Sequence, residues 1–146
     1  MKSTVTRSTL AAFACAVAIA FASPSWAAML NLKADLKASN EVPPGTGSGA
    51  GTVTATYDTD SKKLSWKGSY SGLSGPPTAA HFHIGEAGKN GGVAVPIFTA
   101  ATAKTPFEGS ATLTDAQATD LMAGKLYVNV HTDAHKAGEI RGQLLK

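Results

Sequence analysis

The sequence contains a single cysteine, Cys15, and it falls inside a hydrophobic run at residues 10–22. If that run is removed with a leader, the remaining chain has no thiol. This excludes disulfides, thiolate metal ligands and a cysteine nucleophile. The run is too short for a comfortable membrane span and no second run follows it, so we expect no membrane span.

The chain also lacks a large excess of charge of either sign: it has 13 Lys and Arg residues and 10 Asp and Glu residues, a net charge of +3. Two of the basic residues, Lys2 and Arg7, precede the hydrophobic run, and without them 11 basic residues stand against 10 acidic ones. A balance this even gives no reason to expect binding to nucleic acid or to an anionic membrane. The sequence also lacks a glycine-rich phosphate loop and a nucleophile elbow.

The first 27 residues have the three parts of a secretory signal peptide. Two basic residues come first, the hydrophobic run follows, and Ser25-Trp26-Ala27 offers small residues for a signal peptidase. We predict a signal peptide at residues 1–27 and a periplasmic or secreted domain at residues 28–146. A lipoprotein leader ending at Cys15 is the alternative, but apolar sequence continues well past that cysteine.

Beyond residue 27 the sequence alternates between apolar and polar residues in short segments separated by turns, which is typical of half-buried strands. A helix is predicted after Thr114, because Gln117 completes a capping box and Gly124 is placed to end the helix. Pro96 favours an edge position for its strand. We therefore predict an all-β fold, a Greek-key or immunoglobulin-like β-sandwich with one short helix. The predicted strands are residues 30–36, 52–57, 64–70, 78–84, 93–98, 107–113, 126–131 and 139–144.

All four histidines lie in two short segments, His81-Phe82-His83 and His131-Thr132-Asp133-Ala134-His135. Side chains at i and i+2 of a strand share a face, so the first two imidazoles point the same way, opposite Phe82. His131 likewise opposes the apolar Val130. If the two strands are neighbours, three imidazoles converge as metal ligands, with His135 as a further candidate. A polar surface patch without metal is the alternative.

Other charged residues near the histidines are expected to be solvent-exposed, namely Glu86, Asp133 and Glu139. Arg141 points away from Ile140 and is interpreted as a surface arginine. Two further roles remain open for it. It could pair with a carboxylate such as Glu139 or Glu41, or it could draw an anion toward a metal.

Several motifs spread over residues 40–144 resemble the CHRD domain, a module named after chordin that is found in bacterial exported proteins. The resemblance implies a β-sandwich that contains the histidines 81, 83 and 131, and it implies no particular biochemical activity. The motifs are Asn40-Glu41-Val42-Pro43-Pro44, Gly72-Leu73-Ser74-Gly75, Ala80-His81-Phe82-His83-Ile84-Gly85, Tyr127-Val128-Asn129-Val130-His131-Thr132 and Gly138-Glu139-Ile140-Arg141-Gly142-Gln143-Leu144.

A fainter resemblance is to copper,zinc superoxide dismutases, whose copper ligands and active-site arginine occur in a similar order. That likeness implies copper on His81, His83 and His131, with Arg141 beside an open coordination position. The chain has no set of zinc ligands, no cysteine pair and no clear bridging histidine, so we expect little or no superoxide dismutation.

Two functional hypotheses follow from the sequence. The first is an exported protein that binds copper through its histidine cluster and serves copper binding or tolerance. Copper is favoured over zinc because imidazole suits it and divalent copper stands highest in the affinity series. The second is a non-catalytic protein-interaction module whose histidines decorate an exposed sheet, and a copper-only enzyme like superoxide dismutase is a further alternative.

Overall fold

The computed structural model describes residues 28–146, and the predicted signal peptide at residues 1–27 lies outside the described residues. Eight strands and one α-helix follow one another along this part of the chain, which confirms the predicted all-β class. The elements are β1 (Met29–Lys37), a 3-10 turn η1 (Ala38–Asn40), β2 (Ala50–Asp58), β3 (Lys63–Ser71), β4 (Pro77–Ile84), β5 (Val93–Thr99), β6 (Phe107–Thr112), α1 (Asp115–Met122), β7 (Leu126–Thr132) and β8 (Ile140–Gln143).

Alternation of side chains explains why these segments form strands. In β1 the residues Leu32, Ala34 and Leu36 are buried, while the lysines between and after them are exposed. A strand places successive side chains on opposite faces. The alternation in β1 therefore fits a sheet with one face packed against the core and the other exposed to solvent.

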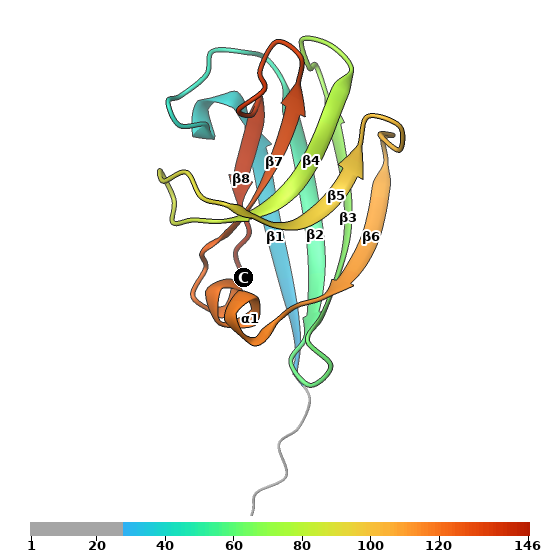
Figure 1. Ribbon diagram of the computed structural model, residues 1–146, viewed down its shortest axis with the longest axis vertical. Coiled ribbons are helices and arrows are strands. Elements are labelled where there is room, and N and C mark those ends of the chain that lie inside the picture. The colour runs from blue at the N-terminus through green and yellow to red at the C-terminus, as the bar shows by residue number, and fades with distance from the viewer. Residues whose placement is uncertain (1–27) are drawn as a thin grey trace, which may run out of the picture.

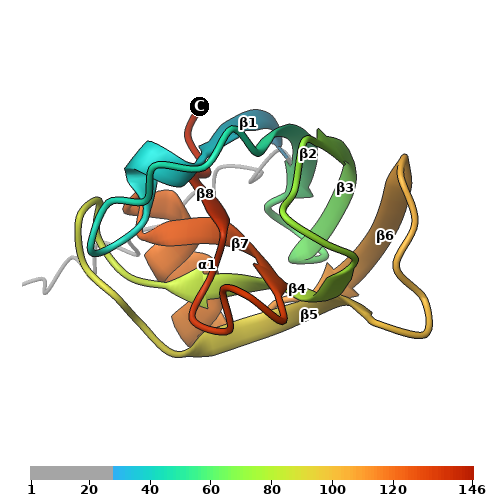
Figure 2. The same ribbon diagram turned by 90° about the horizontal axis from the view of Figure 1, so that it is seen from above.

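The strands form one antiparallel sheet in the order β5-β4-β7-β8-β1-β2-β3-β6. The sheet curls so strongly that its first four strands face its last four and nearly close a barrel (Figures 1 and 2). The two layers of the predicted sandwich are therefore halves of one sheet. β4 pairs with β7, and β3 with β6, which joins strands that are not consecutive, as Greek-key connections do. Pro96 lies in the edge strand β5, as predicted.

Aromatic side chains from both halves meet in the core. Trp66 of β3 contacts Phe82 of β4 edge to face, with ring centroids 5.1 Å apart. Phe98 of β5 and Phe107 of β6 meet in the same way at 5.4 Å, where the curled sheet comes closest to closing. These contacts add to the packing of the buried aliphatic side chains between the two halves of the sheet. Among residues 28–146, no helix is long and apolar enough to cross a membrane.

The helix α1 begins with the capping box that the sequence predicts. The Thr114 hydroxyl accepts a hydrogen bond from the Gln117 amide at 3.2 Å, and the Gln117 side-chain oxygen accepts one from the Thr114 amide at 2.9 Å. The Gln117 side-chain nitrogen also donates to the Ala94 carbonyl, which ties α1 to β5. Gly124 follows the helix at φ +71°, a left-handed conformation that glycine adopts at low cost.

Replacing the capping threonine tests how much this helix start contributes. Thr114→Ala should lower the free energy of unfolding by about 1 kcal/mol, because one helix amide loses its partner. Urea denaturation measures the difference. Thr119→Ala, in the exposed middle of α1, is the matched control and should be neutral or slightly stabilising, because alanine has the higher helix propensity. Equal losses in both variants would contradict a capping role.

Candidate metal centre

The register between β4 and β7 brings three histidines together. In this antiparallel pair His81 lies opposite Asn129, and His83 lies opposite Tyr127. His131 lies opposite Ala79, and is therefore a diagonal neighbour of His81. The intervening residues of both strands point into the core, so all three imidazoles lie on the outer face of the sheet, as their alternation predicts.

Two of the three rings are fixed by backbone carbonyls. His83 Nδ1 lies 3.1 Å from the Gly91 carbonyl oxygen, and His131 Nδ1 lies 3.0 Å from that of Lys136. A carbonyl only accepts hydrogen bonds, so both Nδ1 atoms carry the proton and both Nε2 atoms carry a lone pair. His81 Nδ1 lies 3.2 Å from His131 Nε2 and therefore donates to it in the metal-free protein.

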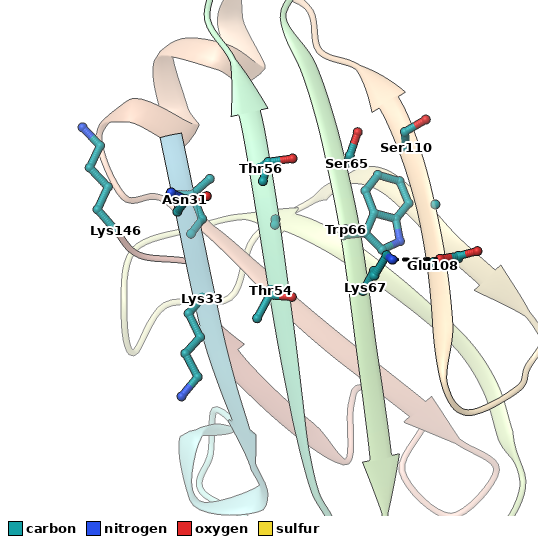
Figure 3. Close-up of a pocket in the computed structure, with 13 residues that line it drawn as sticks. Asn31, Lys33, Thr54, Thr56, Ser65, Trp66, Lys67, Glu108, Ser110 and Lys146 are labelled. Carbon is teal, nitrogen blue, oxygen red and sulfur yellow. Dashed lines mark ion pairs between the residues drawn. The ribbon is translucent and has the colours of Figure 1, made fainter. Parts of the chain in front are cut away.

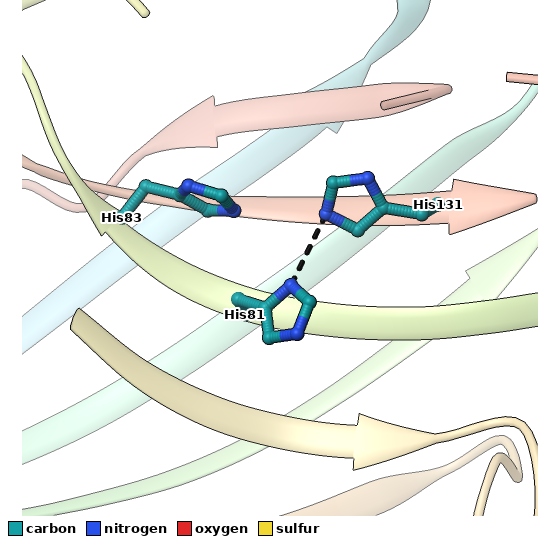
Figure 4. A group of neighbouring side chains, drawn as sticks. All are labelled: His81, His83 and His131. Carbon is teal, nitrogen blue, oxygen red and sulfur yellow. Dashed lines mark hydrogen bonds between the residues drawn. The ribbon is translucent and has the colours of Figure 1, made fainter. Parts of the chain in front are cut away.

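The three rings converge on one point of space (Figure 4). One ring nitrogen from each residue lies within 4.8 Å of the other two. Nitrogen ligands about 2.0 Å from a common metal ion lie at most about 4 Å apart, so a small closing movement would complete a three-nitrogen site. The donor set that fits is Nε2 of His83, Nε2 of His131 and Nδ1 of His81. The first two atoms carry lone pairs, and His81 Nδ1 would become a ligand once its proton moves to His81 Nε2.

Burial keeps these imidazoles uncharged. Desolvation lowers the pKa of His81, of His83 and of His131 below the ordinary histidine value of 6.5. For His83 and His131 the carbonyl hydrogen bonds oppose this effect, whereas the neighbouring imidazoles add to it. The His83 Nε2 atom is buried and has no hydrogen-bond partner. Neutral rings with unused lone pairs are in the state that binds a metal ion.

Arg141 lies behind the histidines and is only 2% exposed, so its interpretation as a surface arginine is wrong. Its guanidinium donates to the carbonyls of Glu86 and Lys89 at 3.1 and 2.7 Å, and to the Asn90 side chain at 3.2 Å. It also stacks on Tyr127, with Cζ 3.4 Å from the ring centroid. Arg141 thus anchors the loop at residues 85–92, the hairpin connection that carries the Gly91 carbonyl.

Glu41 and Asn129 form a second buried polar contact beside the site. The Asn129 side-chain nitrogen donates to Glu41 Oε2 at 3.3 Å, while Glu41 Oε1 and Asn129 Oδ1 are buried without partners. Burial raises the pKa of Glu41 to about 7, although Asn129 and the Arg141 charge act to lower it. Glu41 belongs to the proline- and glycine-rich loop before β2, so this loop contacts the outer face of β7 through the Glu41 side chain.

The fourth histidine, His135, is not brought into this group, which contains His81, His83 and His131. His135 is exposed and lines a separate cavity of about 310 Å³, together with Glu41 and Glu139. Glu139 was expected to be exposed but is buried, because its carboxylate accepts hydrogen bonds from the amide and hydroxyl of Ser74 and from the Thr132 hydroxyl. That contact closes the 72–76 loop onto β7.

A larger hollow, of about 810 Å³, lies far from the histidines on the β1-β2-β3-β6 half (Figure 3). Threonine, serine, lysine and asparagine side chains line it, and Lys67 pairs with Glu108 across it at 3.7 Å. It contains no histidine and only one carboxylate, so it offers no comparable set of metal ligands.

Comparison with known proteins identifies the family. The family model of the CHRD domain matches residues 32–144, nearly all of the described chain. The chain belongs to the CHRD domain family. No curated protein and no solved structure matches it. In this CHRD domain the matched region contains the whole histidine group together with Glu41, Asn129 and Arg141.

Several residues of this CHRD site were missed by sequence reasoning. The contacts made by the Gly91 and Lys136 carbonyls could not be predicted from the sequence, because every residue has a backbone carbonyl. Asn129 and Tyr127 did carry a signal, since they share the alternation of His131 and so had to lie on its face. Glu41 was considered as a partner of Arg141, but its burial against Asn129 had no signal in the sequence.

A carboxyl group whose pKa is higher in the folded state stabilises the fold fully below its unfolded pKa near 4.5, and that stability is lost as the pH rises through about 7. Glu41→Gln removes this loss, because an amide does not ionise. Between pH 5 and pH 8.5 the variant should therefore gain stability relative to the parent, by at most about 3 kcal/mol at 1.36 kcal/mol per pKa unit.

Urea denaturation of Glu41→Gln and of the parent across this pH range measures the effect. Titration of the histidines changes the stability of both proteins equally, so it cancels in the comparison. The exposed Glu108→Gln controls for the loss of one negative charge. Parallel stability curves for Glu41→Gln and the parent would show that Glu41 is not desolvated.

Proposed function

We propose that this CHRD domain is an exported protein that binds one copper ion through His81, His83 and His131, for copper binding or tolerance. The observation that carries the proposal is the convergence of three neutral imidazoles, two of which have their Nδ1 protons committed to backbone carbonyls. A carbonyl bonded to the far nitrogen of a metal-binding histidine fixes its tautomer and orientation, as is usual around metal sites. Export rests on the predicted signal peptide.

The donor set favours copper over other divalent ions. The three ligands are all nitrogens, which suits copper, nickel and zinc and disfavours magnesium and calcium, which prefer oxygen. Among the first-row divalent ions copper stands highest in affinity. His81 is half-buried, whereas the other two rings are buried, so an ion would reach the site from the His81 side.

Binding, not turnover, is the activity proposed. The likeness to superoxide dismutases would place Arg141 at an open copper position to attract an anion, but its guanidinium is committed to the 85–92 loop. An interaction module with decorative histidines is the second candidate. It has less support, because exposed decoration would leave the rings solvated, whereas His83 and His131 are each 8% exposed and individually hydrogen-bonded.

Substitution of the histidines tests the site directly. His81→Ala, His83→Ala and His131→Ala should each weaken copper binding by more than the 10- to 100-fold typical of losing a group that merely supports a ligand. His135→Ala is the matched control and should bind as the parent does. Titration of untagged protein against a competing chelator measures the affinities. Nitrogen splitting in the copper(II) electron paramagnetic resonance spectrum should weaken in the three ligand variants.

The interaction-module alternative predicts a different result. Copper affinity would then be weak in the parent and unchanged in all four variants. A parent that binds zinc more tightly than copper would keep the site but overturn the identity of the metal.

The pH dependence of binding follows from the lowered pKa values of the three histidines. Imidazoles that are already neutral at pH 7 release almost no protons when the metal binds, so copper affinity should be nearly flat between pH 7 and pH 8. Copper affinity should fall only below pH 6.5, where protons begin to compete with the metal ion for the ring nitrogens. Titrations at several pH values, in buffers that do not bind copper, measure this profile. An affinity unchanged down to pH 5 would point to carboxylate ligands instead.

A further inference from the structure

A three-layer stack lies on the protein side of the histidine group. The His83 and Tyr127 rings are nearly parallel, with an interplanar angle of 10° and centroids 5.0 Å apart. Arg141 stacks on the same tyrosine, with Cζ 3.4 Å from the ring centroid. Because β7 lies between β4 and β8 in the sheet, the imidazole and the guanidinium occupy opposite faces of the Tyr127 ring.

The stack is held firmly. Tyr127 is 2% exposed, and its hydroxyl accepts a hydrogen bond from the Gly91 amide at 3.0 Å. The carbonyl of the same residue, Gly91, holds His83. Arg141 fixes the loop that contains Gly91 through the Glu86 and Lys89 carbonyls. His83 is therefore positioned both by the ring beneath it and by the loop that Arg141 anchors.

The charge of Arg141 is not cancelled by an ion pair. Its hydrogen-bond partners are carbonyls and an amide, and within residues 28–146 no carboxylate lies at ion-pair distance from it. The nearby Glu41 is only partly ionised at neutral pH, because burial raises its pKa to about 7. A buried, uncancelled positive charge therefore lies close to a group of ligands that carries no charge of its own.

We propose that Arg141, acting through the Tyr127 stack, makes the three-histidine site favour monovalent over divalent copper. The inference rests on the proposed copper site and adds its preference for one oxidation state. Three neutral donors leave the full charge of the ion uncompensated, so divalent copper is repelled by Arg141 twice as strongly as monovalent copper. For a charge roughly 10 Å from the ion at an effective dielectric constant near 20, the extra repulsion corresponds to roughly a tenfold change in relative affinity.

The same electrostatics already act on the metal-free site. Burial is the main reason why the pKa of His83 is lowered, and the positive charges of His81, when it is protonated, and of Arg141 add to it. The Arg141 charge, one of the smaller causes of this lowering, would also repel a copper ion at this position. Arg141 is thus a positioning and charge-tuning residue that does not touch the metal.

The test compares dissociation constants for the two oxidation states. Monovalent copper is titrated without oxygen against a chromophoric chelator, and divalent copper against an amino-acid competitor, in the parent protein, Arg141→Gln and Arg141→Lys. The ratio of divalent to monovalent dissociation constants should fall about tenfold in Arg141→Gln. It should stay within about threefold of the parent in Arg141→Lys, which keeps the charge but not the planar fork.

Equal ratios in the parent and Arg141→Gln would overturn the proposal, and so would equal falls in Arg141→Gln and Arg141→Lys, because loop anchoring would then be the cause. Glu41→Gln tests the same electrostatics without disturbing the stack. At pH 8 it removes a negative charge near Arg141, so its ratio should rise, and an unchanged or lower ratio would contradict the proposal even if Arg141→Gln does not fold. A parent protein that binds neither copper ion would instead refute the proposed function itself.

Discussion

The pairing of β4 with β7 is the constraint on which the site depends. These strands are separated along the chain by the edge strands β5 and β6 and the helix α1, yet their register sets His81 and His83 against Asn129 and Tyr127. A shift of one residue would turn every one of these side chains into the core and bring Phe82 to the outer face. The apolar partners, Phe82, Val128 and Val130, are all fully buried, so the hydrophobic core fixes the register that the histidines require.

The sequence predicts the face of each histidine but not the neighbour of each strand. Alternation fixes that His81, His83 and His131 oppose the core, and the structure places them there. Whether β4 and β7 pair depends on crossover connections, and these follow from the way the whole sheet curls, which no local pattern encodes. The capping box at Thr114 and the edge position of Pro96 were predictable because each follows from the chemistry of one or two residues.

The error over Arg141 and Glu139 has a common cause. Both residues were expected to face solvent because they lie opposite or beside apolar core residues, and an outer sheet face is usually wet. Here two loops, at residues 72–76 and 85–92, lie against these side chains, and polar backbone groups of both loops satisfy the buried charges. The outer face of β4, β7 and β8 is therefore also largely buried, and its buried side chains are mostly polar where those of the core are apolar.

The three histidines differ in burial and in hydrogen bonding on this polar face. His83 and His131 are buried, and carbonyls of two different loops hold them through Nδ1, so the direction of both Nε2 atoms is set without a metal ion. His81 is half-buried, and its Nδ1 contacts only His131 Nε2, itself one of the nitrogens that would bind the metal. In the proposed copper site an incoming ion would have to replace that hydrogen bond, while the two hydrogen bonds to the carbonyls would remain intact. The two fixed donors would then set the position of the ion, and the movement needed to admit or release it would fall on His81.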